Sequence, residues 1–340
     1  PVLEGYKDSV GAGVHVRFSD PVGFDLLSLT ASYTPDDDLP SNERVHASID
    51  FRHFLWKAGI SWNDADFYDL FGPTKRSRKG HKVYVEYERP FIYRPPETLS
   101  LTARLAYHGD LDALPSFQNV ASPVNELYTA NIGLTHRNAR ASIGNVDDET
   151  GHVWSVLGHI YGANGRITPG IIGQFDVGFA LPLGHSSVWL RSAAGVSSGD
   201  RDDPLTNAYF GGFGNNYVDD GEAKRYRDVL SLPGFELNAI GGKSFAKAMV
   251  EWNLPPLRFE KLGTPGFYVS WGRPALFTTA LVTDPHDGEF REEAYNVGAQ
   301  LDFQLHVLHR LPMMLSIGYA AGFAGGGRGE DEFMLSLKVL

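Results

Sequence analysis

The feature that most constrains the fold of this sequence is an alternation of apolar and polar residues with a period of two. In the segment 43–52, every second residue is apolar, at Val45, Ala47, Ile49 and Phe51. Side chains of a β-strand point alternately to its two faces, so this pattern predicts a strand with one apolar and one polar face.

Segments of this kind recur along the chain, each about ten residues long. They predict about fifteen strands and no amphipathic helix. The predicted strands are 10–18, 24–34, 43–52, 54–63, 80–89, 97–105, 125–136, 152–162, 170–181, 187–196, 243–254, 266–282, 296–305, 312–323 and 332–340. A soluble β-sandwich would show the same alternation, but it is usually smaller. Closing so many strands into one barrel removes the edges that an open sheet would expose.

The links between these strands are a second indication of a barrel. Tight links near 52–53, 183–185 and 309–311 alternate with long ones at Pro35–Glu43, Asp64–Gly80, His108–Asn125, Ser197–Gly242 and Asp284–Glu293. Outer-membrane barrels have short periplasmic turns and long extracellular loops, and their strands cross the membrane in about 9–11 residues. Such barrels usually have an even number of strands. We therefore expect one further strand within Pro1–Ser9, 64–80 or 108–124, or upstream of Pro1.

Composition narrows the range of functions. The 340 residues include 30 Lys+Arg against 41 Asp+Glu, a net charge of −11 that argues against nucleic-acid binding. Because cysteine is absent, disulfides and Cys-based zinc sites are excluded. The HExxH motif, the P-loop and the dinucleotide fingerprint are also missing. We expect a single barrel domain, 1–340, that is part of a longer protein and is not an enzyme, with no cofactor and no metal.

The longest irregular region, Ser197–Gly242, contains the run NAYFGGFGNNYVDDGEAKRYRDVLSLPGFELNAIGG and is followed by KSFAKAMVEWNLP. This order of an aromatic-Gly-Gly element, a long loop, a second Gly-Gly and a strand with an acidic-aromatic pair resembles the outer-membrane assembly-factor superfamily typified by BamA and TamA. These proteins are also called bacterial surface-antigen barrels. The resemblance extends to GFYVSWG and to GLTHRNARASIGNVDDETG, and covers about the last two thirds of the chain.

The resemblance implies a sixteen-stranded barrel whose sixth extracellular loop folds into the lumen. In that family an arginine of a Val-Arg-Gly-Phe-like motif at the loop tip pairs with acidic residues on the inner wall. Two segments compete for the motif here. One is Asn216-Tyr217-Val218, which follows Gly211-Gly212, and the other is Leu232-Pro233-Gly234-Phe235. On the wall, Glu251 matches the family's glutamate, and Ser270 stands where an aspartate is usual.

Glu251 lies on the polar face of its predicted strand, together with Lys247 and Asn253, so we expect it to point inward. Arg225 or Arg227, from the run KRYRD, would then supply its partner. The alternative is that both arginines lie on a solvated surface loop.

Lys75, Arg76, Arg78 and Lys79 form the one concentrated basic patch in the sequence. In the barrel topology this patch lies on the outer side, where the phosphates of lipopolysaccharide are the nearest anions. The alternative is a solvated loop without a specific lipid contact.

These observations leave three candidate functions for this chain. The first is the barrel of an assembly or translocation protein, which would insert or transport proteins or lipids at the outer membrane. Its partners would be outer-membrane lipids, lipopolysaccharide, client proteins and an upstream periplasmic domain. The second is a passive pore or small-molecule channel of the same architecture, because fold does not fix function. The third is a soluble all-β binding protein or enzyme.

Overall fold

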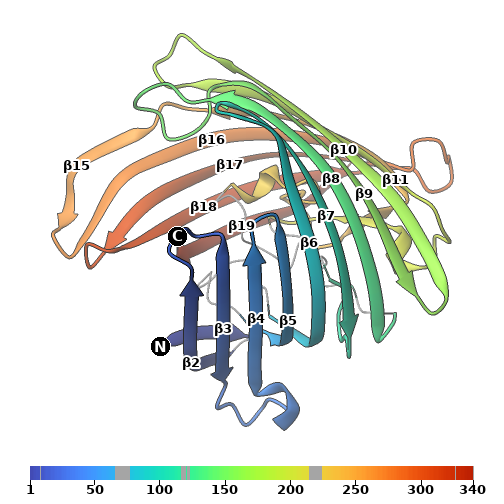
Figure 1. Ribbon diagram of the computed structural model, residues 1–340. Coiled ribbons are helices and arrows are strands. Elements are labelled where there is room, and N and C mark those ends of the chain that lie inside the picture. The colour runs from blue at the N-terminus through green and yellow to red at the C-terminus, as the bar shows by residue number, and fades with distance from the viewer. Residues whose placement is uncertain are drawn as a thin grey trace.

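A computed structural model describes residues 1–7, 9–65, 77–115, 120, 123–213, 224–325 and 327–339 (Figure 1). The strands are β1 (Val2–Tyr6), β2 (Ser9–Ser19), β3 (Asp25–Tyr33), β4 (Val45–His53), β5 (Trp56–Asp64), β6 (Arg78–Arg94), β7 (Glu97–Gly109), β8 (Glu126–Arg140), β9 (Thr150–Ala163), β10 (Arg166–Ala180), β11 (Ser187–Ser197), β12 (Ala208–Phe210), β13 (Ile240–Gly242), β14 (Ser244–Asn253), β15 (Leu257–Thr264), β16 (Phe267–Thr283), β17 (Glu292–Val307), β18 (Leu311–Ala324) and β19 (Gly327–Val339). Three short 3-10 helices are η1 (Ser41–Glu43), η2 (Pro204–Thr206) and η3 (Arg225–Arg227). Within the described residues, no helix has the length and apolar character needed to span a membrane.

The strands of the barrel wall follow one another in chain order. Each strand from β1 to β11 pairs antiparallel with the next, and β11 then pairs with β14. The wall continues through β16, β17, β18 and β19. β14 and β15 occupy one position, because β14 pairs with the second part of β16 and β15 with its first part. The 17-stranded sheet therefore has sixteen positions.

The predicted all-β antiparallel barrel of about sixteen strands is confirmed. The strand missing from the sequence-based count is β1, which lies within Pro1–Ser9. β12, β13 and β15 also escaped prediction. The first two are three-residue strands inside a long loop, and β15 carries a register irregularity between Arg258 and Leu262.

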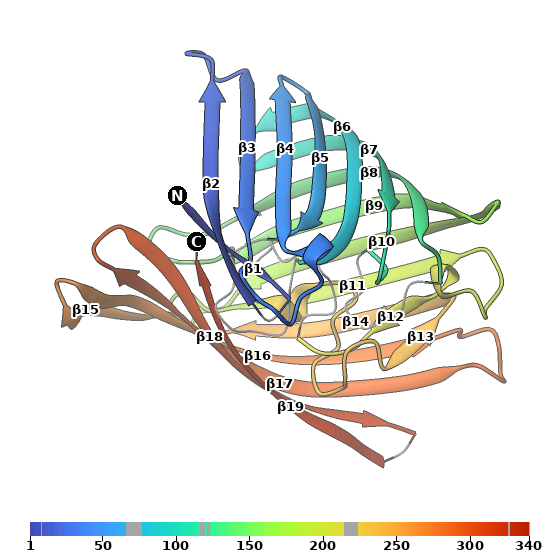
Figure 2. The same cartoon turned by 90° about the horizontal axis from the view of Figure 1, so that it is seen from below.

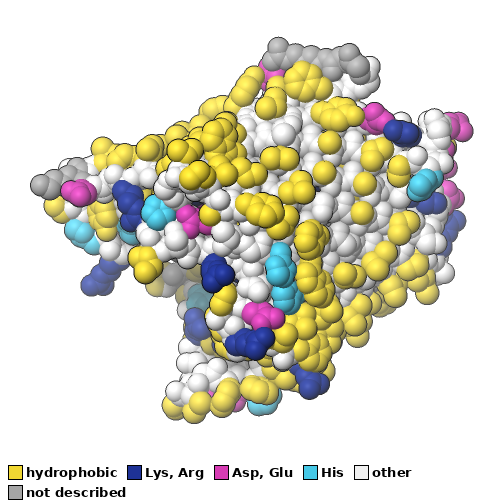
Figure 3. All heavy atoms as spheres, turned by 90° about the horizontal axis from the view of Figure 1, so that it is seen from above, with side chains coloured by type: hydrophobic (Ala, Val, Ile, Leu, Met, Phe, Trp, Pro, Cys, Tyr) yellow, Lys and Arg dark blue, Asp and Glu magenta, His cyan; other side chains and the backbone are white. Residues whose placement is uncertain are grey.

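The wall is polar inside and apolar outside. On β14, Lys247 and Glu251 are buried, whereas Val250 is 45% exposed. On β17, Asp302 is buried and Val297 is 54% exposed. Figure 3 shows hydrophobic side chains spread over the outer surface. An apolar outer surface around a polar interior is the arrangement of a barrel in lipid.

Connections of different length lie at the two ends of the barrel, as the sequence predicted. The end with long loops carries 34–44, 65–77, 110–125, 198–243 and 284–291, and the other end carries mostly tight turns. Connections that depart from this rule occur at both ends. The link 164–165 is tight at the long-loop end, and the link 141–149 is long at the opposite end.

The segment 198–243 is the sixth connection at the long-loop end, counting from β1, and we call it the lumenal loop. Seen from below in Figure 2, its strands β12 and β13 lie within the curve of the sheet. The predicted sixth loop folded into the lumen is therefore present.

Candidate functional site

The lumenal loop folds inward on an apolar base. Phe210, Leu232 and Ile240 from the loop pack against Phe245 of β14 and Leu281 of β16 in one buried cluster. Burial of apolar surface stabilises by roughly 25 cal/mol per Å². These wall residues interrupt the otherwise polar inner face where the loop covers it, and so favour the folded-in position.

Residues 224–227 of the lumenal loop, which we call the loop tip, converge on Glu251. This glutamate is fully buried in β14. Arg227 Nη2 lies 2.7 Å from Glu251 Oε1, Lys224 Nζ lies 3.0 Å from the same oxygen, and Tyr226 Oη donates to it at 2.8 Å. From the wall, Arg191 Nε donates to Glu251 Oε2 at 2.7 Å. One carboxylate therefore binds three side chains of the loop tip and one of β11.

A second carboxylate reaches the tip from the opposite end of the barrel. Asp147, in the connection 141–149, accepts from Arg227 Nη2 at 2.6 Å and lies 3.4 Å from Lys224 Nζ. Its third partner is Arg273 Nη1 of β16, at 3.2 Å. The connection is held inside because Trp189 Nε1 donates to the Asp148 carbonyl at 3.2 Å. The long link at the tight-turn end thus meets the lumenal loop inside the barrel.

Among the described residues, these contacts belong to one ionic network. Its carboxylates are Asp147, Asp176, Glu251 and Asp302, and its cations are Arg191, Lys224, Arg227 and Arg273. Buried ions are costly to desolvate, and removing one partner leaves the others uncompensated. The network therefore makes the position of the loop tip depend on each of its members.

The pKa values of Asp147 and Lys224, which lie outside the wall strands, reflect this environment. Burial raises the pKa of Asp147, but Arg227, Lys224 and Arg273 outweigh it, so the pKa of that carboxyl lies well below its usual range. For Lys224, burial together with Arg227 and Arg273 lowers the pKa to about 8, against the pull of Glu251 and Asp147. The network favours charge on Asp147 and disfavours it on Lys224.

Lys247 of β14 holds the return arm of the loop. Its Nζ donates to the carbonyls of Asp228 at 2.8 Å, Val229 at 2.9 Å and Ser231 at 2.5 Å. An ammonium group has three donors, and here all three bind loop backbone.

Glu332 of β19 joins the two arms of the loop. It accepts from the backbone N–H of Phe213 and of Gly234, each at 3.0 Å. Gly234 has φ +91°, and a Cβ there would lie 2.5 Å from the backbone nitrogen of Gly322 in β18. Glycine is required at this close approach of loop to wall.

The structure places several predicted loop residues in these contacts. Gly211 and Gly212 donate their N–H groups to the carbonyls of Leu230 and Phe235, so the two arms of the loop pair with each other. The Pro233 carbonyl accepts from Asn296 Nδ2 of β17 at 2.8 Å. Asn216 and Tyr217 lie outside the described residues.

Of the two arginines predicted to partner Glu251, the structure brings Arg227 to it. Arg225 Nη2 instead donates to Ser336 Oγ of β19 at 2.9 Å. The two arginines diverge because one residue separates them in η3.

Ser270 is not in the network. It lies at a register irregularity between Val269 and Trp271, and its Oγ donates to the Gln304 carbonyl at 3.3 Å. Arg273 is the residue of β16 that joins the network. Its side chain points inward because of the register irregularity and the alternation of the residues that follow it.

The predicted basic patch is only partly described, because Lys75 and Arg76 lie outside the described residues. Arg78 is 9% exposed and its Nη2 lies 3.1 Å from Asp64 Oδ2 on the inner wall. Lys79 Nζ lies 3.1 Å from Asp110 Oδ1. Arg78 therefore does not suit a contact with lipid phosphate, because β6 begins at this residue and its alternation turns the side chain inward.

Sequence reasoning missed Asp147, Asp176, Arg191, Arg273, Asp302 and the anchoring role of Lys247. The alternation of β11 would have indicated Arg191, because it lies two residues after the buried Trp189 and therefore on the same inward face. Asp147 had no local signal, because its role depends on how the connection 141–149 turns.

Comparison with solved structures supports the fold. BamA from Haemophilus ducreyi lacking POTRA domains 1–3 matches with a TM-score of 0.56 and 12% identity, covering 99% of this chain and 69% of that chain. CdiB from Acinetobacter baumannii matches at 0.49 and 14% identity, covering 99% of this chain and 58% of that chain. Wzi, a carbohydrate-binding outer-membrane barrel involved in group 1 capsule assembly in Escherichia coli, matches at 0.35 and 11% identity, covering 98% and 79%. At 12% identity, the likeness to BamA is one of fold.

No protein-family model matches the sequence, and no curated protein matches it. The chain has the fold of an outer-membrane β-barrel.

Proposed function

We propose that this chain is the outer-membrane barrel of an assembly or translocation protein related to the BamA and TamA superfamily. It takes part, without a catalytic centre, in inserting or transporting proteins or lipids at the outer membrane. The observation that carries the proposal is the lumenal loop, which is folded inward and fastened at its tip by Arg227 to Glu251. Outer-membrane lipids, lipopolysaccharide, client proteins and an upstream periplasmic domain are its proposed partners.

The contacts of the loop divide the wall into two parts. The loop-facing wall, made of β11, β14, β16, β17 and β19, binds the loop by side chains such as Glu251, Lys247 and Glu332. The open wall, made of β4 to β7, carries ion pairs between its own strands. The first strand of the barrel, β1, which pairs with β2, is only five residues long. The loop therefore stabilises the C-terminal part of the wall, whereas the N-terminal part begins with a short strand that makes few backbone hydrogen bonds. This arrangement suits a barrel whose N-terminal strands separate to admit a client.

Reconstitution tests the proposal. The full-length protein in liposomes should accelerate the folding of an unfolded eight-stranded outer-membrane barrel, measured by heat-modifiable gel mobility. An unrelated sixteen-stranded porin at equal density is the control. Acceleration should fall at least about tenfold, or 1.4 kcal/mol, in Glu251→Gln. Failure to insert or translocate any client or lipid would refute the proposal.

A passive pore is the second candidate, and two cavities favour it. One of about 380 Å³ and one of about 340 Å³ both include Arg104 in their lining, on the open wall. Planar-bilayer conductance separates the candidates. A stable open pore that is unaffected by deleting 213–240 would support a channel, and a mostly closed, noisy barrel that opens on this deletion would support the first proposal.

A further inference from the structure

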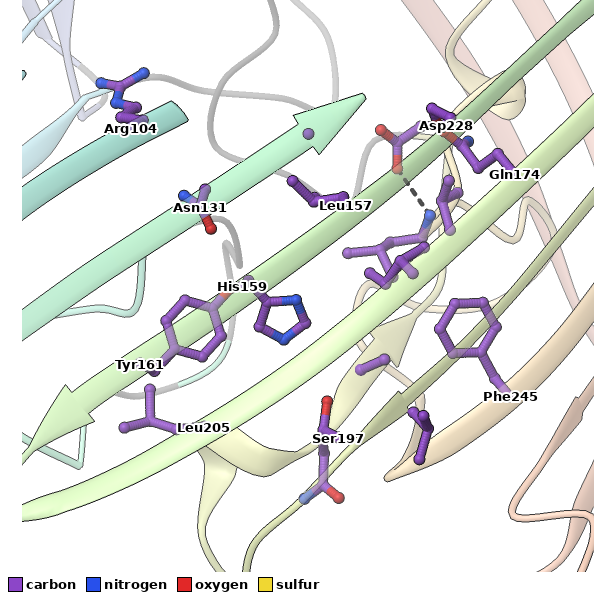
Figure 4. A pocket seen from close by; sticks show the side chains of 18 of the residues that line it. Arg104, Asn131, Leu157, His159, Tyr161, Gln174, Ser197, Leu205, Asp228 and Phe245 are labelled. Carbon is purple, nitrogen blue, oxygen red and sulfur yellow. Dashed lines mark hydrogen bonds between the residues drawn. The ribbon is translucent and has the colours of Figure 1, made fainter. Parts of the chain in front are cut away.

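The cavity of about 380 Å³ lies between the inner wall of β6 to β11 and the lumenal loop (Figure 4). Its volume is within the range of about 300–1,000 Å³ that is typical of small-molecule sites. The loop supplies one side, with Leu205, Asn207 and Leu230. The cavity therefore exists only when the loop is folded inward.

The strand register arranges the wall of this cavity in rows. Thr102 pairs with Gly133, Gly133 with Leu157, and Leu157 with Ile172, which places a mostly apolar strip across β7 to β10. One neighbouring row contains Arg104, Asn131 and His159, and the other contains Ser155 and Gln174. An apolar strip between two hydrogen-bonding rows suits a ligand with an apolar face and a polar rim.

Two polar side chains, one from β9 and one from the lumenal loop, line this cavity. The His159 side chain is buried, and Figure 4 shows its ring in the cavity, beside Tyr161 of the same strand. The ring lies over Gly170, where a Cβ would come within 2.3 Å of His159 Nε2. On the loop, Asn207 Oδ1 is buried without a hydrogen-bond partner. A buried polar group that no protein atom satisfies points to a bound ligand or water.

The charged groups of the cavity are already engaged. Arg104 Nη1 lies 3.5 Å from Glu86 Oε2, Lys243 Nζ donates to the Gly199 carbonyl at 2.6 Å, and Asp228 Oδ1 accepts from the Leu230 N–H at 2.8 Å. Recognition is therefore left to neutral donors and acceptors. Hydroxyl groups both donate and accept, which matches a mixed set of imidazole, amide and hydroxyl side chains.

We propose that this cavity is a binding site for a neutral, hydroxyl-rich ligand, a mono- or disaccharide. The C–H face of a sugar ring would lie on Leu157, Ile172 and Tyr161, and its hydroxyls would bond Asn131, His159 and Asn207. Because the loop forms one side, the bound sugar stabilises the folded-in loop by mass action. This site goes beyond the proposed function, and its test involves no client protein.

Titration calorimetry on the full-length protein tests the site, in a detergent without a sugar head group so that no glycoside competes. The probes are maltose, lactose and sucrose, and at least one should bind saturably with a millimolar or lower Kd, about −4 kcal/mol or stronger. Absence of saturable binding by all three would overturn the proposal and leave a water-filled cavity.

A pair of matched variants locates the binding. In Gly133→Leu the new Cβ meets no atom closer than 3.6 Å, so the side chain grows into the cavity, and affinity should fall at least tenfold. Gly173→Leu is the control, because Gly173 faces outward between Ile172 and Gln174 and a Cβ there has open space. His159→Phe, which keeps the ring over Gly170, should also weaken binding. Equal affinity in Gly133→Leu and Gly173→Leu would refute the site, and heat-modifiable mobility reports folding of each variant.

Discussion

The loop-facing wall and the open wall both carry many charged side chains, but they pair them in different ways. On the loop-facing wall, Glu251 and Arg273 bind groups from the loop tip and from the connection 141–149. On the open wall, Lys57 pairs with Glu86 and Glu88 of the next strand. The first arrangement joins segments that are distant in sequence, and the second joins neighbouring strands that the backbone ladder already holds.

The two arrangements also differ in burial. Glu251 is fully buried, whereas the side chains of Lys57 and Glu88 are 38% and 47% exposed. A buried ion that loses its partner is strongly destabilised, and an exposed pair contributes little. The same kind of substitution should therefore have very different effects in the two parts of the wall.

The largest effect is expected for Glu251→Gln. This change leaves Lys224, Arg227 and Arg191 without their shared carboxylate and should destabilise the folded-in loop by about 3–5 kcal/mol. Trypsin cleaves after lysine and arginine, and Lys224 and Arg225 are buried in the wild-type protein. We expect rapid cleavage at 224–227 in the variant and protection in the wild type, followed by gel and mass spectrometry.

A wild-type rate of cleavage in Glu251→Gln would show that the apolar base of the loop suffices. That result would contradict the proposal that buried ion pairs of the loop-facing wall hold the loop in place.

A smaller effect is expected for Asp147→Asn, which keeps the side-chain size and removes the charge. Losing a hydrogen-bonded charge costs about 1.5–3 kcal/mol. The pKa of Asp147 is held below its ordinary 3.8, so its contribution is present above that pH and is lost as the pH falls below it. Tryptic cleavage after Arg227, measured at pH 7.5, should lie between those of the wild type and Glu251→Gln.

The matched control is Asp148→Asn in the same connection. The side-chain partner of Asp148 is Arg137, which is 46% exposed, so this variant should behave as wild type. Equal cleavage in the two variants would mean that the connection as a whole, and not the carboxylate, supports the tip.

The strands were predictable because every wall strand has one lipid face and one lumenal face. β1 escaped because five residues, Val2–Tyr6, are too few to show a period. The segment 141–149 was recognised in the sequence, but its place in the site was not predicted. No local sequence pattern indicates that a connection turns into the lumen. Glu251 and Arg227 could be named from the strand face and the loop charge. Asp147 and Arg273 could not, because their contacts depend on the tertiary fold.

Lys224 offers a test that uses pH. Its pKa is about 8 in the folded loop and 10.5 when exposed, so the released loop binds more protons between these values. The free energy of loop release should therefore rise with pH, on the order of 1 kcal/mol between pH 7.5 and 9. Thermal melting followed by circular dichroism should show this rise in the wild type. In Lys224→Met the rise should vanish, and its persistence there would assign it to another group.

The smallest effect is expected on the open wall, for Glu88→Gln. Lys57 still pairs with Glu86 at 3.0 Å in this variant. Both side chains of the lost pair, Lys57 and Glu88, are more than a third exposed, so the free energy of unfolding should fall by at most about 1 kcal/mol. Cleavage at 224–227 should match the wild type, and the small change in melting should shrink further in 1 M salt, where the Debye length is about 3 Å. Release of the lumenal loop by this substitution would mean that the two walls are coupled through the lumen, and the division between them would have to be abandoned.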